Sequence, residues 1–378
     1  MTMAAAAPAG PERRDDERPL ILHVFPTFAV GGAQVRCCAV VNRFGGRWRH
    51  VVIPLDGRED SLERIQPGID LTCAPSPVRP GDGPARLLRI RATLRRLRPD
   101  VLITSNWGSI EWGLANLLPP RVRHIHMEDG FGPDEASGQK PRRVLARRLI
   151  LRRSEIVLPS QVLLRAARDI WRLPASRLHY IPNGLDLRRF QAGGPPDISV
   201  PGDGPVIGTV AKLRAEKNIA RLLRACAILS AEGVKLRLLI VGDGPEQAAL
   251  EECARANGLS GRALFAGHMP DPAAAYRAMD VFALSSDTEQ MPFSVLEAMA
   301  SGLPVAATDV GDVRTMLVSG NAPYLAARDD AALAAVLRPL LADAGLRRRL
   351  GAENRVKAER DYDQETMFQA YAALIEAR

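Results

Sequence analysis

The sequence has few of the residues that characterise secreted, membrane-spanning and disulfide-bonded proteins. Its 378 residues include only five cysteines, none of them in a paired spacing: Cys37, Cys38, Cys73, Cys226 and Cys253. Unpaired thiols are typical of a reducing compartment, so we expect a cytoplasmic chain. No apolar run reaches the roughly 18 residues of a membrane span. The alanine-rich start becomes charged too early for a secretory signal, and we expect residues 1–18 to be a disordered tail.

Two further absences exclude classes of function. Aromatic residues make up 5% of the chain and do not interleave with its arginines, which argues against a nucleic-acid-binding protein. A dinucleotide-binding G-x-G-x-x-G is missing after the first apolar segment, which argues against a dehydrogenase. An Asp-x-Asp pair occurs at Asp361 and Asp363, where helix capping explains it, so we expect no metal or other cofactor.

The positive charge lies in the first half of the chain. Residues 1–190 hold 31 Lys and Arg against 19 Asp and Glu, whereas residues 191–378 hold 20 against 24. Arg143, Arg147 and Arg148 lie at helical spacing with apolar residues inside the basic stretch 140–153, which includes Leu149, Ile150 and Leu151. Two interpretations stay open. The stretch is either a surface helix with a solvated arginine face, or a helix that attaches the protein peripherally to an anionic cytoplasmic membrane face.

Short apolar segments alternate with helix-length segments along the whole chain. This pattern predicts parallel α/β architecture in two doubly wound, Rossmann-like domains. A Gly-, Pro- and Asp-rich stretch at 191–204 reads as a linker, which puts the domains at 19–190 and 205–360, followed by a C-terminal helix at 361–378. The predicted strands are 20–25, 50–55, 69–74, 101–105, 121–127, 155–160, 205–210, 235–241, 262–267, 280–285 and 304–308.

The segment TEQMPFSVLEAMA, residues 288–300, sets Glu289 and Glu297 eight positions apart around a predicted helix start at Pro292. Because a strand is predicted just before it, Glu289 falls on a strand-to-helix loop. That is the edge of an open α/β sheet where ligands bind. The free N–H groups at the helix start also favour anions and hydroxyl oxygens there.

This segment resembles the Glu-x7-Glu signature of the retaining family 4 glycosyltransferases, which have the two-domain GT-B fold. The match includes Glu289, the run Glu297 to Ala300, Gly302, Pro304 and Val305, while Gln290 and Pro292 replace the family's two glycines. The resemblance implies that Glu289 and adjacent backbone groups hold the transferred sugar. It implies that Glu297 holds the ribose of the nucleotide and that the last helix returns to the first domain.

Other segments match the family in the second half of the chain. The resemblance implies that Lys212 and Lys217, on one predicted loop, stabilise the leaving diphosphate, and two cations at the mouth of a strand suit that task. The remaining residues implied for donor binding are Gly242, His268, Met291, Phe293 and Ser294.

In the first half, the loop Gly31-Gly32-Ala33-Gln34 resembles the family's glycine loop. Its backbone amides would approach the donor phosphate or the acceptor, together with Gln34. A histidine in the family meets the transferred sugar. His126 or His124 is the counterpart, with His126 preferred because it lies nearer the loop. Glu128 and Asp129 are candidates for acceptor contact or for taking the acceptor's proton.

The resemblance covers roughly residues 20–360 and predicts a retaining, metal-independent glycosyltransferase. It would move a sugar from a nucleotide-diphosphate sugar to a lipid-linked, polysaccharide or other glycan acceptor. Two alternatives stay open. One is a GT-B epimerase or phosphorylase-like enzyme, and the other is a catalytically weak membrane-associated scaffold, suggested by Gln290 and Pro292.

Overall fold

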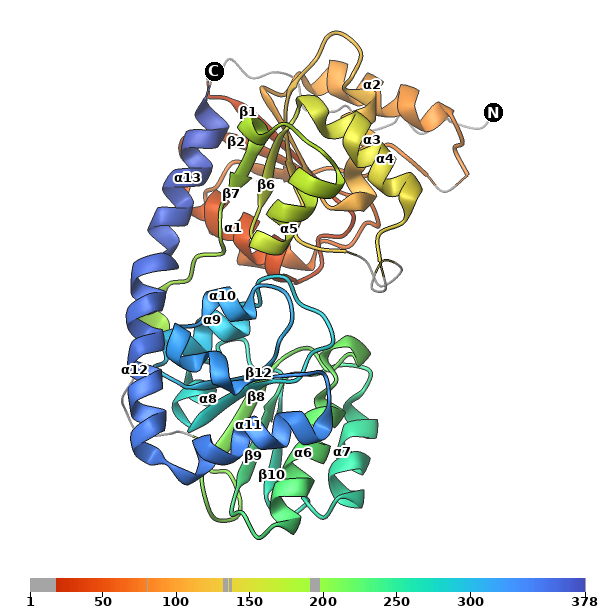
Figure 1. Cartoon of the computed structure of the whole chain (residues 1–378). Helices are drawn as coiled ribbons and strands as arrows, with labels where there is room; N and C mark the ends of the chain where they lie inside the picture. The colour runs from red at the N-terminus through yellow and green to blue at the C-terminus, as the bar shows by residue number, and fades with distance from the viewer. Residues whose placement is uncertain (1–17, 80, 132–134, 136–137, 191–197, 378) are drawn as a thin grey trace. The chain divides into compact units, whose positions relative to one another are not determined.

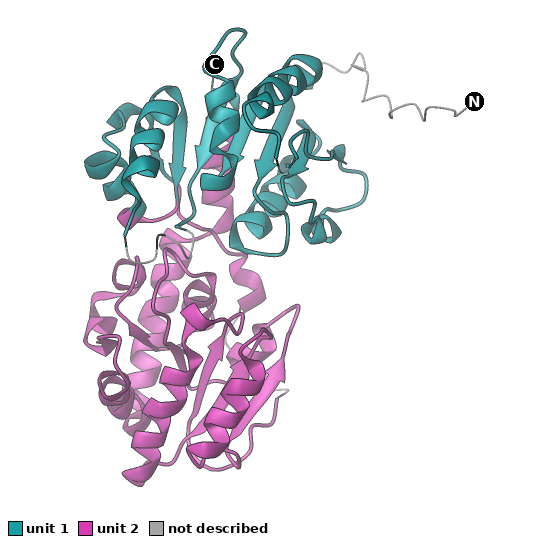
Figure 2. Ribbon diagram, turned by 90° about the vertical axis from the view of Figure 1, so that its right-hand side faces the viewer, with its two compact units in different colours: residues 1–158, 163–180, 374–378 teal, residues 159–162, 181–373 magenta. Residues whose placement is uncertain are grey.

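The computed structural model describes residues 18–79, 81–131, 135, 138–190 and 198–377, and these form two compact units. Unit 1 comprises residues 1–158, 163–180 and 374–378, and unit 2 comprises residues 159–162 and 181–373 (Figure 2). Most of the predicted tail, 1–17, and half of the predicted linker, 191–197, lie outside the described residues. Among those described, no helix has the length and apolar character needed to cross a membrane.

Unit 1 is built on a parallel sheet with strand order β3-β2-β1-β4-β5-β6-β7 (Figure 1). The strands are β1 (Leu20–Phe25), β2 (Arg49–Pro54), β3 (Leu71–Cys73), β4 (Val101–Ser105), β5 (Arg123–Met127), β6 (Glu155–Leu158) and β7 (Leu178–Tyr180). The helices that accompany them are α1 (Gly32–Phe44), α2 (Ala85–Leu97), α3 (Ile110–Ala115), α4 (Pro141–Ile150) and α5 (Gln161–Arg165).

Unit 2 repeats the arrangement with strand order β10-β9-β8-β11-β12-β13, again all parallel. Its strands are β8 (Val206–Val210), β9 (Arg237–Val241), β10 (Ala263–Gly267), β11 (Val281–Leu284), β12 (Val305–Thr308) and β13 (Leu325–Ala326). Its helices are α6 (Ile219–Ala231), α7 (Gln247–Ala256), α8 (Ala273–Arg277), α9 (Phe293–Ala300), α10 (Val313–Met316), α11 (Asp330–Ala342), α12 (Ala344–Asp361) and α13 (Gln364–Glu376), the last of which ends in unit 1.

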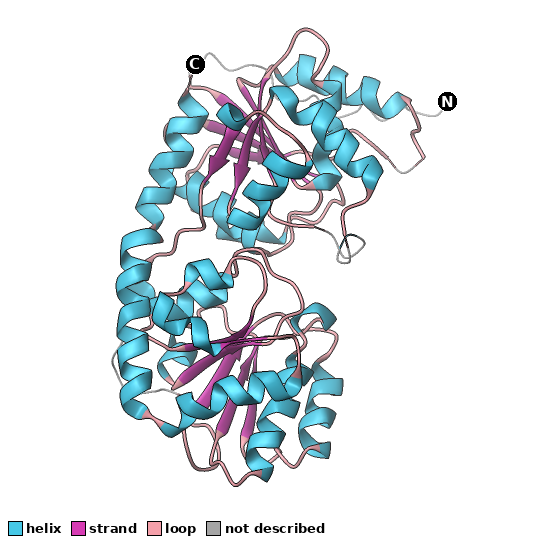
Figure 3. Cartoon of the chain, in the orientation of Figure 1, coloured by secondary structure: helices cyan, strands magenta, loops and turns pink. Residues whose placement is uncertain are grey.

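Helices cover both faces of each sheet, so the strands are buried on both sides (Figure 3). In β11, for example, Phe282 and Leu284 pack into one apolar cluster, while Val281 and Ala283 pack into another on the opposite face. Strands buried on both faces read as continuous apolar runs, which is why they could be located from the sequence. The predicted parallel α/β fold with two doubly wound sheets is confirmed.

The structure places the division between the units earlier than the predicted boundary at residue 190. Residues 181–190 belong to unit 2. The Asn183 side chain donates to the Met291 carbonyl at 3.0 Å, and Leu185 forms a parallel bridge with Asp363. Beyond the undescribed part of the linker, Val200 is buried in the core of unit 2. These contacts tie the segment to the second sheet, and composition alone carried no sign of them.

Candidate functional site

The strand order of unit 2 reverses between β8 and β11, which are hydrogen-bonded neighbours although far apart in sequence. The loop after β8 carries Lys212 and Lys217, and the loop after β11 carries Glu289. Loops that leave a sheet in opposite directions at such a switch point open a space at the carboxyl edge of the strands, where ligands bind in this architecture. The topology therefore brings the predicted residues to one edge of the sheet.

Glu289 and Lys217 form an ion pair at this edge. Glu289 Oε1 accepts from Lys217 Nζ at 2.6 Å and from the Ser286 hydroxyl at 2.7 Å. Glu289 Oε2 has no hydrogen-bond partner among the described residues. The following loop packs tightly against this one, since a Cβ at Gly311, where φ is +55°, would overlap the Glu289 carbonyl. The carboxylate is thus held by one oxygen, while the other can still accept a hydroxyl hydrogen.

Glu297 lies on α9, one turn after the helix start at Phe293. Its Oε2 accepts from the Tyr276 hydroxyl at 2.6 Å. Burial raises the pKa of Glu297 even though the Tyr276 hydrogen bond opposes that shift. Burial, followed by the Glu297 charge, also raises the pKa of Tyr276. Tyr276 was not predicted from the sequence because it lies in α8, outside any recognisable motif.

Lys212 has a different partner from Lys217. Its Nζ lies 2.7 Å from Asp243 Oδ1, and the His268 ring lies 3.8 Å from the same oxygen. The Lys212 hydrogen bond is the main cause that lowers the pKa of Asp243. Gly242, where φ is +133°, lets the loop before Asp243 approach the loop that carries Lys212, since a Cβ there would overlap the Ala211 carbonyl. Lys212 and Asp243 are both about half exposed, so an incoming anion could replace the carboxylate.

The start of α9 provides backbone donors rather than a row of side chains. Phe293 and Ser294 are partly buried, and their N–H groups have no hydrogen-bond partner among the described residues. Met291 was predicted to contact the donor, but only 5% of it is exposed and its side chain packs in the core. Its carbonyl is also taken by Asn183. The side-chain part of that prediction is therefore not supported.

In unit 1, the predicted glycine loop leads from β1 into α1. Gly31 is the N-cap residue and Gly32 opens the helix. Gln34 is 8% exposed, and its side-chain amide donates to the Thr27 carbonyl at 2.9 Å. The Gln34 side chain therefore closes the loop on itself. Only the backbone of this glycine loop could then contact a ligand.

Both histidines proposed as the sugar contact belong to one buried hydrogen-bond chain. The Thr104 hydroxyl oxygen lies 2.7 Å from His126 Nδ1 and 2.8 Å from His124 Nε2. His124 Nδ1 lies 2.7 Å from the Ser154 hydroxyl, and His126 Nε2 lies 3.4 Å from Glu128 Oε2. His126 is fully buried and its two ring nitrogens already have protein partners. In this structure it therefore has no surface to offer a sugar.

Glu128 and Glu135 surround Arg147, which is fully buried. Arg147 Nε lies 3.1 Å from Glu128 Oε2, and Arg147 Nη2 lies 3.2 Å from Glu135 Oε2. Three aromatic rings enclose its guanidinium group, with centroids 5.0 to 5.4 Å from Cζ: Trp107, Phe131 and Trp171. Burial disfavours the charged form of Glu135, but hydrogen bonds from Arg147 and Arg143 outweigh it and lower its pKa.

This arrangement corrects two predictions. Arg147 was placed on a solvated or membrane-facing side of its helix, together with Ile150 and Leu151, yet all three are buried. Glu128 was predicted to touch the acceptor, but its side chain has no exposed surface. Asp129, the other candidate, is paired with Arg36 at 2.6 Å and is 16% exposed. The signal missed in the sequence was the set of aromatic residues distant along the chain that enclose Arg147.

The described residues contain no cluster of three or more His, Cys, Asp or Glu side chains that could hold a metal ion. Asp363 of the predicted Asp-x-Asp pair accepts from the Glu365 N–H at the start of α13, at 2.7 Å. Asp361 pairs with Arg360 at the end of α12.

Two family models match the chain, one in its first half and one in its second. Residues 30–189 match Glycosyltransferase Family 4, and residues 195–357 match Glycosyl transferases group 1. A D-inositol 3-phosphate glycosyltransferase from Xylanimonas cellulosilytica is 29% identical over 357 residues, covering 83% of this chain and 84% of that protein. A 2-deoxystreptamine glucosyltransferase from Streptomyces kanamyceticus is 39% identical over 29% of this chain. The match spans only 28% of that relative.

Among solved structures, Anabaena HepE in complex with UDP has a TM-score of 0.78 at 19% identity, covering 94% of this chain and 99% of that one. Sucrose-phosphate synthase from Thermosynechococcus elongatus has a TM-score of 0.74 at 20% identity, covering 94% and 98%. These likenesses confirm the GT-B fold. The comparisons do not favour the epimerase, phosphorylase or scaffold alternatives.

Proposed function

Because the chain belongs to the family 4 glycosyltransferases with the GT-B fold, we propose that it transfers a sugar from a nucleotide-diphosphate sugar to a glycan acceptor, with retention of anomeric configuration. The observation that carries this proposal is the pairing of Glu289 with Lys217, beside Glu297 and the start of α9, at the switch point of unit 2. The HepE structure, which is a complex with UDP, supports a nucleotide-linked donor.

In the proposed reaction, the bond between the anomeric carbon and the diphosphate oxygen breaks, and a bond from that carbon to an acceptor oxygen forms. The acceptor proton passes to the departing diphosphate. Lys217 and Lys212 stabilise the charge that develops on that group, and Lys212 exchanges Asp243 for phosphate. Glu289 orients a sugar hydroxyl through Oε2, while Lys217 and Ser286 fix the carboxylate through Oε1. Glu297 accepts hydrogen bonds from the ribose.

The carboxylate roles are tested by two substitutions. Glu297→Ala should weaken nucleoside diphosphate binding, because a lost hydrogen bond to a charged group costs about 1.5–3 kcal/mol, or roughly ten- to hundredfold in affinity. Glu289→Ala should mainly lower turnover. Calorimetry with UDP and GDP, followed by turnover with the corresponding sugar nucleotides, separates the two effects. Unchanged nucleotide affinity in Glu297→Ala would remove this residue from the ribose site.

We also propose that positive charge from the two lysines makes a metal ion unnecessary. Activity should then survive EDTA and be lost in Lys217→Gln, which also leaves Glu289 without its cation. Loss of activity on chelation that manganese restores would contradict this part of the proposal. The retained configuration would be read from the anomeric signals of the product by NMR.

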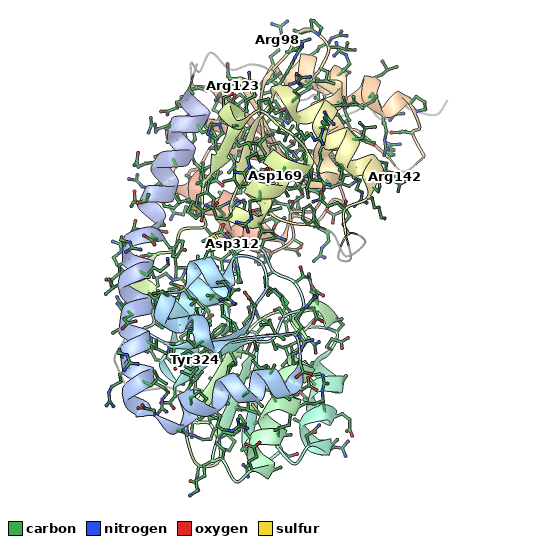
Figure 4. The ribbon with its side chains drawn as sticks, in the orientation of Figure 1. Arg98, Arg123, Arg142, Asp169, Asp312 and Tyr324 are labelled. Carbon is green, nitrogen blue, oxygen red and sulfur yellow. The ribbon has the colours of Figure 1, made fainter. Side chains whose placement is uncertain are left out.

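We propose a lipid-linked or envelope-polysaccharide acceptor. The protein would reach it by docking on an anionic membrane through the exposed surface of α4 and of the turn that follows it. Leu145 is 56% exposed and Leu149 is 62% exposed. Three exposed arginines lie three or four residues from one of these leucines, at the start of α4, near its end and in the turn that follows it: Arg142 (Figure 4), Arg148 and Arg152. An arginine near such a surface contributes about 1 kcal/mol. The named function of one relative, lipopolysaccharide core biosynthesis glycosyltransferase LpsE of Rhizobium meliloti, fits such an acceptor.

Vesicle co-sedimentation at low and high salt tests this docking surface. Arg148→Glu/Arg152→Glu should release the protein from anionic vesicles. Arg95→Glu/Arg96→Glu, with the same charge change on exposed residues of α2, should not. Equal sedimentation of the two variants would indicate that α4 is only a solvated helix.

A further inference from the structure

Unit 1 contains a pocket at the edge of its sheet opposite to Glu128. Its volume is about 210 Å³, and it is lined by residues at the beginnings of β5 and β6, the end of α3 and the turn after α4. In a parallel sheet all strands begin at one edge and end at the other. Because Glu128 follows the end of β5, the pocket and the glycine-loop edge are separate sites.

Four arginines line this pocket against a single carboxylate. They are Arg121, Arg123, Arg153 and Arg177, and the carboxylate is Glu155. Glu155 is already neutralised, since its Oε1 lies 2.5 Å from Arg177 Nη1 and its Oε2 lies 2.7 Å from His179 Nε2. The lining therefore carries an excess of positive charge that no described acid compensates.

The donors of these arginines are not all engaged. Arg123 uses both terminal nitrogens on the Leu374 and Ile375 carbonyls at the end of α13, so it is fixed at the wall of the pocket (Figure 4). Arg121 uses only Nε, which donates to the Leu117 carbonyl at 2.7 Å. Arg153 has no hydrogen-bond or ion-pair partner among the described residues. Capping of helix ends accounts for Arg123 and for one nitrogen of Arg121, but not for Arg153.

Two buried polar side chains also line the pocket, Ser154 and His124. Ser154 is 2% exposed, and its hydroxyl is hydrogen-bonded to the buried His124 ring at 2.7 Å. Burial, with a smaller effect from His126, lowers the pKa of His124 to about 3, so this wall is uncharged at neutral pH. The charge of the pocket thus comes from arginines at its rim.

We propose that this pocket binds the phosphate group of a small phosphate-bearing molecule, with Arg121 and Arg153 as its principal ligands. The planar guanidinium group matches phosphate oxygens in pairs, which an ammonium group cannot do. The volume is below the roughly 300–1,000 Å³ of sites for drug-sized ligands, so a phosphate with a short organic group fits better than a nucleotide sugar. The site does not depend on the function proposed for unit 2.

Calorimetry of the full chain with inorganic phosphate and with glycerol phosphate, at constant ionic strength, tests the proposal. Arg121→Gln/Arg153→Gln should weaken binding about tenfold or more. The matched control is Arg95→Gln/Arg96→Gln on α2, which removes the same charge from exposed arginines that do not line the pocket and should bind as the wild type does. Unfolding curves of both variants confirm that their folds are intact, as expected for exposed residues.

A second arm distinguishes a soluble ligand from a lipid headgroup. Phosphatidylcholine vesicles are prepared with either phosphatidic acid, a phosphate monoester, or phosphatidylglycerol, a diester. Binding to phosphatidic acid that needs Arg121 and Arg153, without heat from the soluble probes, assigns the pocket to a lipid phosphate. Wild-type protein that binds no phosphate probe in either arm would overturn the proposal. So would equal losses in the two double variants, which would indicate unspecific attraction to a basic surface.

Discussion

The two units use acidic residues in opposite ways. In unit 2, Glu289 and Glu297 each have one oxygen bound by protein donors, at the edge of the sheet. In unit 1, Glu128 and Glu135 lie fully buried around Arg147 and its aromatic rings. The first arrangement has partners that a ligand can replace or supplement, and the second has partners that must stay in place. Proximity of charged groups alone therefore does not distinguish a binding site from a structural cluster. Here the two differ in exposure, because Glu289 and Glu297 keep some exposed surface and the Glu128 and Glu135 side chains keep none.

The largest expected effect comes from breaking the buried cluster. Arg147→Met keeps an apolar side chain between the rings but leaves the buried Glu128 without its arginine and Glu135 with Arg143 alone. Removing one partner of a buried ion pair costs about 3–5 kcal/mol, so the free energy of unfolding should fall by that amount. Urea denaturation followed by tryptophan fluorescence measures it.

Arg148→Gln, one residue further along and exposed, is the control and should change stability by no more than about 0.5 kcal/mol. If the two variants are equally stable, Arg147 is not the centre of a structural cluster. The distinction between a structural cluster in unit 1 and a binding site in unit 2 would then be wrong.

A smaller effect on the free energy of unfolding is expected when the pH is lowered. Burial, and then His126, lowers the pKa of His124 from 6.5 to about 3, so the folded state excludes a proton that the unfolded state takes up. This contribution to stability is complete above pH 6.5 and is lost as pH falls toward 3. Between about pH 7 and pH 5 it should amount to roughly 1–2 kcal/mol.

His124→Asn should therefore make unfolding less sensitive to pH over that range, whatever its own stability at pH 7. Parallel curves for wild type and His124→Asn would show that this ring is not kept neutral by its surroundings.

The smallest effect is expected at Glu297, in the candidate site of unit 2. Tyr276→Phe removes the hydrogen bond that opposes the burial effect on Glu297, so the pKa of Glu297 should rise further. Less of the carboxylate is then ionised, and nucleoside diphosphate affinity should fall about tenfold, more at acidic pH than at alkaline pH. Calorimetry at two pH values measures it. A uniform loss at both values would mean that Tyr276 only positions the helix.

Sequence patterns identified the fold and the edge of unit 2 because both depend on local signals. Apolar strands buried on two faces are visible in one dimension, and Glu289 and Glu297 belong to a single short segment. The short strands β7 and β13 were not predicted, although β3, which also has three residues, was. The two residues of β13 carry too little pattern. The burial of Arg147 could not be inferred, since Trp107 and Trp171 approach it from segments about forty residues before it and twenty-four after it.

The buried hydrogen bonds that run from Ser154 through His124, Thr104 and His126 to Glu128 all have their donors on a defined side. His126 Nε2 faces the Glu128 carboxylate and therefore carries a hydrogen. When Nδ1 of the same ring is bare, Thr104 must donate to it and accept from His124, and His124 must accept from Ser154. Because the Thr104 hydroxyl has one hydrogen to give, the tautomers of the two rings are linked through it. The tautomer of His124 thus depends on which nitrogen of His126, on the other side of Thr104, carries the hydrogen. Nitrogen-15 chemical shifts of the two rings would show both tautomers.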